Sequence, residues 1–321
     1  MPFFPARRLL WAALALALNV AHAETWPERP ITLVVPFAAG ASADGIARIV
    51  ARELTGTLGQ QVLVENKPGA GGATGLIAVS KATPDGYTIG LGATGAIAVN
   101  PHLPDAPPLS SERQLQPLAK LADIPLVLVA GSQSGFPTLH AVLEKGKTTE
   151  IPTGNSGIYT SQHLAAELLA SMAKIRLSSV PYRGSAPAVT DLLGGQMPLA
   201  VVDLTSAAGH VKSGSLRALA VTSAKRTKVA PDIPTMAEAG VPGYAASAWM
   251  GLFAPKGLPP SVVERLGREI RAALAKADVQ AQIVALSAEP AYLDAAAFAS
   301  FIAGESKKWS TVIASIPKPT K

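Results

Sequence analysis

The sequence contains no cysteine among its 321 residues. This excludes disulfide bonds, cysteine nucleophiles, thiolate metal sites and a lipidated N-terminal cysteine. Aromatic residues make up only 5% of the chain and charged residues 16%, which favours neither a base-stacking surface nor a highly charged disordered chain. Hydrophobic residues reach 48%, so the chain has enough apolar side chains for large cores. Its length suits two domains of ordinary size.

The first 23 residues resemble a secretory signal peptide. Arg7 and Arg8 precede an apolar run over residues 9–18. Ala21-His22-Ala23 then places alanine at positions −3 and −1 of a predicted cleavage site. No later run approaches the roughly 18 apolar residues that a membrane-spanning helix requires. We therefore expect export to the periplasm by ordinary secretion. A buried N-terminal helix and twin-arginine export are the weaker alternatives.

Positive charge is in modest excess, with a net charge of +6, but it is spread along the chain. Its densest stretch, Lys225-Arg226-Thr227-Lys228, has no interleaved aromatic residues. This pattern predicts a solvated loop rather than a nucleic-acid site.

Short β-branched runs alternate with helical periodicity over most of the chain. The pattern predicts two such series, separated and followed by extended crossings, and a helical tail. Residues 101–109 are proline-rich and irregular. Predicted strands cover 31–35, 61–65, 87–91, 118–124, 126–130, 150–151, 175–180, 199–202, 216–221 and 246–254. Predicted helices cover 46–58, 74–82, 139–145, 160–172, 186–193, 206–212, 235–239, 259–276, 278–286 and 295–313.

Two alternating series predict an α/β fold of two domains, each a sheet flanked by helices. We expect one domain over 24–124 together with 247–321, and the other over 125–246. The chain then crosses between the domains near Ile124–Pro125 and near Ala246–Ala248.

Loops of small residues follow the predicted parallel strands, where open α/β sheets bind ligands. Two of them, 36–44 and 66–72, lead into helix N-termini, whose free N–H groups and dipole favour anions. The alternative is that small residues only make tight turns. The candidate ligand-binding residues are Phe37, Ala38, Ala39, Gly40, Ala41, Ser42, Ala70, Gly71, Thr94, Asn155, Ser156, Ser161, Gly184, Ser185 and Asp203.

Signals for catalysis or cofactors are weak. Gly69-x-Gly71-x-x-x-Gly75 lacks the dinucleotide-binding spacing, Ser171-Met172-Ala173-Lys174 has no accompanying hydrolase motif, and the histidines lack metal-ligand spacing. We therefore predict no catalytic residues, no cofactor and no metal.

Three polar residues near the loops have local alternatives. Asp44 is predicted most simply to cap the first helix, and Asp203 either to cap a helix or to meet a donor on a ligand. His163 either lines the loop beside it or makes a local contact.

Several motifs together resemble the Bug family, the periplasmic receptors of tripartite tricarboxylate transport systems. The resemblance covers nearly the whole chain after residue 26. The motifs are PITLVVPFAAGASAD (30–44), VENKPGAGG (64–72), PDGY (84–87), VPYRGSAPAVTDLL (180–193), LRALAVTSAK (216–225), PDIPTMAEAG (231–240) and GLFAP (251–255).

The resemblance implies a two-domain Venus-flytrap fold with a small carboxylate ligand in the interdomain cleft. Backbone groups and waters of the first-domain loops would hold that ligand, and a monomeric receptor would deliver it to integral membrane transporter subunits. Gly40-Ala41 departs from the family's Gly-Gly, and Tyr159 replaces a residue that is often small. Signalling to a membrane sensor and, more remotely, secreted hydrolase activity are the alternative functions.

Overall fold

The computed structural model describes residues 26–103 and 106–315. The predicted signal peptide lies outside the described residues. Within them, no helix combines the length and the apolar character that crossing a membrane requires.

The first sheet has six strands in the order β11-β4-β10-β3-β1-β2. Strands β1, β2 and β3 are parallel, and β10 lies antiparallel between β3 and β4. A late segment of the chain therefore completes the sheet that the N-terminal segment begins. The strands are β1 (Ile31–Val35), β2 (Val62–Asn66), β3 (Thr88–Ala93), β4 (Leu115–Ile124), β10 (Ala248–Pro255) and β11 (Glu289–Asp294).

The second sheet has five strands in the order β7-β6-β8-β5-β9. Strand β6 runs parallel to β7 and β8, whereas β5 is antiparallel to β8 and β9. The strands are β5 (Leu126–Gly131), β6 (Ile151–Asn155), β7 (Leu177–Pro181), β8 (Leu199–Asp203) and β9 (Leu216–Val221).

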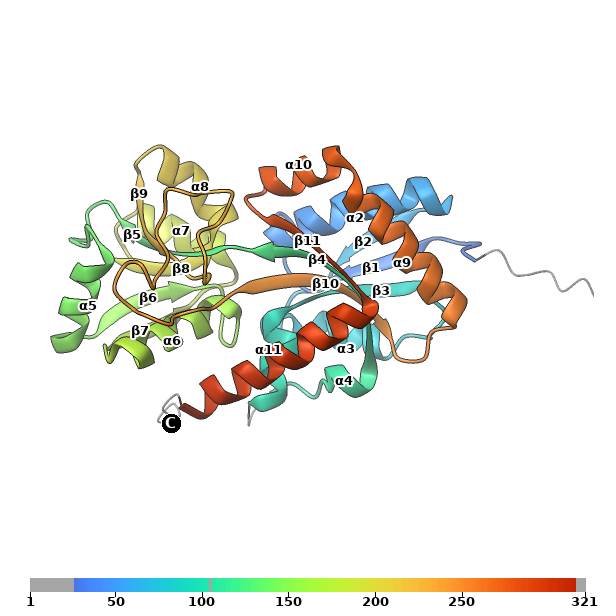
Figure 1. Cartoon of the computed structure of the whole chain (residues 1–321), viewed down its shortest axis with the longest axis horizontal. Helices are drawn as coiled ribbons and strands as arrows, with labels where there is room; N and C mark the ends of the chain where they lie inside the picture. The colour runs from blue at the N-terminus through green and yellow to red at the C-terminus, as the bar shows by residue number, and fades with distance from the viewer. Residues whose placement is uncertain (1–25, 104–105, 316–321) are drawn as a thin grey trace, which may run out of the picture.

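Helices cover both faces of each sheet. On the first sheet, α2, α9 and α10 pack on one face and α3 and α11 on the other, and α7 and α8 cover one face of the second sheet (Figure 1). The helices are α2 (Ser42–Leu58), α3 (Ala73–Ser80), α4 (Ser111–Gln114), α5 (Leu139–Thr148), α6 (Ser161–Ala173), α7 (Ser185–Leu193), α8 (Leu204–Lys212), α9 (Pro260–Ala275), α10 (Ala277–Ala285) and α11 (Ala295–Ser315). Three short helical segments are η1 (Ala70–Gly72), the π-helix η2 (Gly95–Val99) and η3 (Asn100–His102).

The molecule has two lobes, one around each sheet, and the chain passes between them at β4–β5 and again between β9 and β10 (Figure 1). Only Pro125 separates β4 from β5. Side chains alternate along β5: Leu126, Leu128 and Ala130 join a core that continues into the first lobe, whereas Val127 and Val129 join a second core under α7 and α8. The period of two along a buried strand thus places successive apolar residues in different cores.

The predicted α/β class is confirmed, and so is the return of the predicted strand 246–254 to the first sheet. The predicted helix at 235–239 is wrong: these residues form a turn that begins with a bridge from Thr235 to Val221. Strand β11 is missing from the predicted strands, because the short segment Glu289–Asp294 lacks a clear alternation of apolar and polar residues. Pairing with β4 makes this segment a strand.

Candidate functional site

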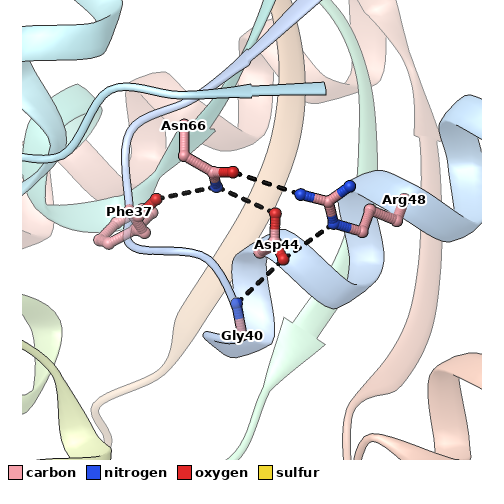
Figure 2. Close-up of polar contacts among 5 residues, drawn as sticks. All are labelled: Phe37, Gly40, Asp44, Arg48 and Asn66. Carbon is pink, nitrogen blue, oxygen red and sulfur yellow. Dashed lines mark hydrogen bonds and ion pairs between the residues drawn. The ribbon is translucent and has the colours of Figure 1, made fainter. Parts of the chain in front are cut away.

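The first loop is held in shape by a polar network around Asp44 (Figure 2). The Asp44 carboxylate accepts hydrogen bonds from Gly40 N (3.0 Å), Asn66 Nδ2 (2.9 Å) and Arg48 Nε (2.9 Å). Asn66 Nδ2 also donates to the carbonyl oxygen of Phe37 at 3.0 Å. Residues at the ends of β1 and β2 and in the first turns of α2 thus tie the loop down. Gly40 permits this path with φ of +82°.

The expectation that Asp44 caps α2 is wrong in detail. The N-cap position is Ala41, and the Asp44 carboxylate reaches back to the amide of Gly40 before it. Burial alone would raise the pKa of Asp44. Hydrogen bonds from Arg48, Gly40 and Asn66, together with the charge of Arg48, hold this pKa below its ordinary value.

Both first-lobe loops present unpaired main-chain donors. Among the described residues, the N–H groups of Ala38, Ala39, Ser42, Ala70 and Gly71 have no hydrogen-bond acceptor. Ala38 and Ala39 are exposed, so water or a solute reaches them. The loops therefore offer several N–H donors to an anion near the start of α2.

The second loop requires unusual backbone angles. Gly69, Gly71 and Gly72 have φ values of 138°, 62° and 99°, and Ala70 has φ of 48°. A Cβ atom on Gly71 would lie 3.4 Å from the carbonyl oxygen of Ile158 in the second lobe. The loop's cation, Lys67, is paired with Glu65 at 3.1 Å.

The third loop combines a buried hydroxyl with a close approach between the lobes. Thr94 is fully buried, and its hydroxyl accepts a hydrogen bond from Trp249 N at 3.0 Å. At Gly95, a Cβ atom would lie 2.8 Å from the carbonyl oxygen of Tyr159. Glycine at position 95 therefore lets the second lobe approach the backbone of the first.

Four of the predicted residues form one hydrogen-bond chain between the lobes. Ser42 Oγ donates to Asp203 Oδ2 at 2.8 Å, and Asp203 N donates to Ser185 Oγ at 3.1 Å. Ser185 Oγ lies 2.7 Å from Ser156 Oγ. The structure thus brings together residues from four separate segments. Gln162, whose Nε2 donates to Asp203 Oδ1, was missed, because a glutamine in the first turn of an apolar helix gives no signal in the sequence.

Asp203 occupies the N-cap position of α8, but its side chain makes no capping hydrogen bond. The residue is 9% exposed, and among the described residues its carboxylate accepts only from the neutral groups of Ser42 and Gln162. Burial raises the pKa of Asp203, and the two hydrogen bonds only partly oppose this. The side chain faces the first lobe instead of its own helix.

The second-lobe loop whose backbone approaches Gly71 and Gly95 includes Ile158 and Tyr159, and His163 holds it in place. Tyr159 has φ of 63°, and its N–H donates to His163 Nδ1 at 3.1 Å. His163 therefore makes the local contact, and its other ring nitrogen carries the proton. Burial lowers the pKa of His163 to about 4, so the ring is neutral at pH 7. The contact of His163 Nε2 with Glu167 Oε1 at 3.6 Å is therefore not a salt bridge at this pH.

The remaining predicted residues shape the loops or line their edges. Asn155 is buried; its Nδ2 donates to Ser179 Oγ (2.8 Å) and its Oδ1 accepts from Gly157 N (3.0 Å). Ser161 is buried at the start of α6, and Gly184 precedes α7 with φ of 124°. Within residues 26–103 and 106–315, no group of histidine, aspartate or glutamate residues could hold a metal ion.

Two α/β lobes joined by crossing strands, with facing loops that offer backbone donors, define the class of two-lobed solute-binding proteins. The chain belongs to the tripartite tricarboxylate transporter family of receptors, whose sequence profile matches residues 46–317. It is 37% identical to the protein BugT of Bordetella pertussis, over 91% of this chain and 90% of that one.

Two solved structures have the same fold throughout. A protein of R. palustris with adipate has a TM-score of 0.86 and 30% identity, over 90% of this chain and 98% of that chain. MatC from Rhodopseudomonas palustris, with bound malate, has a TM-score of 0.82 and 30% identity, over 90% of this chain and 100% of that chain.

Proposed function

We propose that this protein captures a small carboxylate between its two lobes and delivers it to the membrane subunits of a tripartite transporter. The membership in a receptor family and the ligands of the adipate and malate proteins support this proposal. The observation that carries it is the set of unpaired N–H groups of Ala38, Ala39, Ser42, Ala70 and Gly71 in the first-lobe loops. Burying a carboxylate without donors is prohibitive, and these groups supply the donors.

We further propose how the chain is exported and processed and how its two domains move. Residues 1–23 direct export to the periplasm and are removed, and the mature protein acts there as a monomer. Residues 24–124 with 247–321 form one domain and residues 125–246 the other, and they close on the ligand by bending at the two crossings. The protein catalyses no reaction. Hydrogen bonds between the lobes, such as Ser42 to Asp203, stabilise the closed form.

A thermal-shift screen of the purified mature protein against a library of carboxylates tests the function. A ligand at 100 times its Kd stabilises the folded protein by about 2.7 kcal/mol. Purification without citrate or other carboxylate buffers prevents a trapped ligand from masking the shift. Stabilisation by no carboxylate, but by neutral sugars or amines, would contradict the proposal.

Substitutions in the loops test how the anion is held. Gly40 and Gly71 have positive φ, so Gly40→Val and Gly71→Val distort the loops that carry the donors. Arg183 is exposed in the second lobe. We expect each glycine variant to lower ligand affinity at least tenfold, about 1.4 kcal/mol, and Arg183→Ala to cost less. Calorimetric titration of folded variants measures this; loss of binding in Arg183→Ala alone would refute backbone recognition.

A further inference from the structure

Residues 286–289, the linking segment between α10 and β11, belong to the first lobe but bind the second. At one end of this segment, Thr205 Oγ1 in the first turn of α8 donates to the carbonyl oxygen of Leu286. The Leu286 side chain lies against the first turn of α2, because a Cβ atom on Gly45 would be 2.8 Å from Leu286 Cδ1. The linking segment is therefore packed on its own lobe and hydrogen-bonded to the other.

Glu289, at the other end of the linking segment, makes two more hydrogen bonds to the second lobe. Its Oε1 accepts from Thr227 Oγ1 and, at 2.8 Å, from Lys228 N. Glu289 is also fixed in its own lobe, because it pairs with Asp123 where β11 joins β4. Hydrogen bonds to a carboxylate are stronger than those between neutral groups. One short segment of the first lobe thus binds both α8 and the loop after β9.

These contacts lie beside the two places where the chain crosses between the lobes. A cavity of about 250 Å³ is lined by Glu289 and Thr227 together with Pro125 and Ser247, one residue from each crossing. Helix α8 also begins there, since Leu204 N donates to the carbonyl oxygen of Pro125 at 2.9 Å. The linking segment therefore adds a third, non-covalent connection between the lobes next to the two covalent ones.

The linking segment is coupled to the loops that face each other across the lobes. Asp203 and Thr205 lie in the same turn of α8, so their contacts with Ser42 and with the carbonyl oxygen of Leu286 change together. Ser42 shares the first turn of α2 with Gly45, on which Leu286 packs. A rotation that separates Asp203 from Ser42 therefore also separates Thr205 from Leu286.

We propose that the linking segment is a latch, which stabilises the closed form of the protein whether or not a ligand is bound. Its hydrogen bonds join protein atoms outside the donor loops, so they contribute to closure without a ligand. Because the latch offsets part of the cost of closing, a ligand has to shift the equilibrium less. The inference rests on the proposed closure of the lobes but not on the class of the ligand.

Double electron–electron resonance on the ligand-free mature protein tests the latch. The chain has no cysteine, so Glu112→Cys in α4 and Lys145→Cys in α5 place one spin label on an exposed site of each lobe. The distance between these sites in the structure identifies the closed population. In this background, Thr205→Val combined with Glu289→Ala removes the latch. We expect the ratio of closed to open protein to fall about tenfold, because three hydrogen bonds between the lobes are lost.

Matched variants assign the effect to the latch. Thr190→Val with Glu264→Ala should leave the ratio unchanged, because Thr190 bonds within α7 and Glu264 is exposed on α9. Thr205→Ser keeps the hydroxyl and should also leave the ratio unchanged. Circular dichroism checks that each variant is folded. If the double variant is not folded, Thr205→Val and Glu289→Ala alone should each give part of the shift.

Two results would overturn the inference. One is an equal ratio in the latch variants and the matched control, and the other is a ligand-free protein that is open although its latch is intact. Neither result depends on a ligand, so the proposed capture of a carboxylate would stand.

Discussion

The two lobes each place an aspartate beside the start of a helix that follows a strand, and the two residues have opposite surroundings. Asp44 in the first lobe is bonded by Arg48, Asn66 and the amide of Gly40, and its pKa is lowered. Within the described part of the chain, Asp203 in the second lobe accepts hydrogen bonds from neutral donors only, and burial raises its pKa. The first aspartate stabilises its own loop, whereas the second faces the other lobe.

This difference shows that residue type and local position do not determine what an acidic side chain does. Both aspartates are buried, so burial alone does not distinguish them. The distinction comes from Arg48, one helical turn after Asp44, whose charge offsets the cost of burial. Among the described residues, the hydrogen-bond partners of the Asp203 side chain are Ser42 and Gln162, and neither is charged.

The largest expected effect is on stability, from Asp44→Ala. The change removes three hydrogen bonds at once, leaves Gly40 N without its acceptor and leaves Asn66 Nδ2 with the carbonyl oxygen of Phe37 alone. We expect a loss of about 3 kcal/mol in the free energy of unfolding, measured in urea at pH 7. Asp232→Ala, at an exposed residue, is the matched control and should change it by less than about 0.5 kcal/mol. Equal effects of the two changes would mean that the Asp44 network contributes nothing.

Gly95→Ala tests the contact between the lobes. The new methyl group would lie 2.8 Å from the carbonyl oxygen of Tyr159, which is backbone and has little freedom to move. We expect ligand binding to weaken by about 2 kcal/mol, measured by calorimetry, because the closed form is strained. Gly209→Ala is the matched control: it lies in α8 with open space around it, and should stabilise the protein by about 0.5–1 kcal/mol. Unchanged affinity in Gly95→Ala would show that the lobes do not approach this closely when ligand is bound.

Asp203→Asn should have the smallest effect on stability, and the opposite sign to Asp44→Ala. Removing an undercompensated buried charge should stabilise the ligand-free protein by about 1 kcal/mol at pH 7. The pKa of Asp203 lies above its ordinary value of 3.8, so the folded protein takes up this proton before the unfolded chain does. The advantage of asparagine should therefore shrink as the pH falls through the folded-state pKa toward 3.8. Thermal unfolding across this range measures it; an advantage that grows with acidity would refute the assignment.

The sequence predicted most elements that have a strong periodic signal. Strand β1 has the predicted bounds Ile31–Val35, and α2 ends where Gly59 provides a left-handed residue. The π-helix over Gly95–Val99 and strand β11 were missed, because they depend on contacts with distant segments. The same holds for Gln162, whose partner Asp203 is 41 residues away.

The sequence by itself determined the α/β class, the small-residue loops after parallel strands and the family to which the chain belongs. These features depend on short stretches of sequence. The period of the apolar residues determines where helices and strands form, and glycine permits the positive φ values of the loops. Only the tertiary structure decided that Ser42 meets Asp203 across 161 positions of sequence and that Arg48 compensates one aspartate but not the other. A charge's effect depends on the groups within a few ångströms of it, and for Asp203 these come from other segments of both lobes.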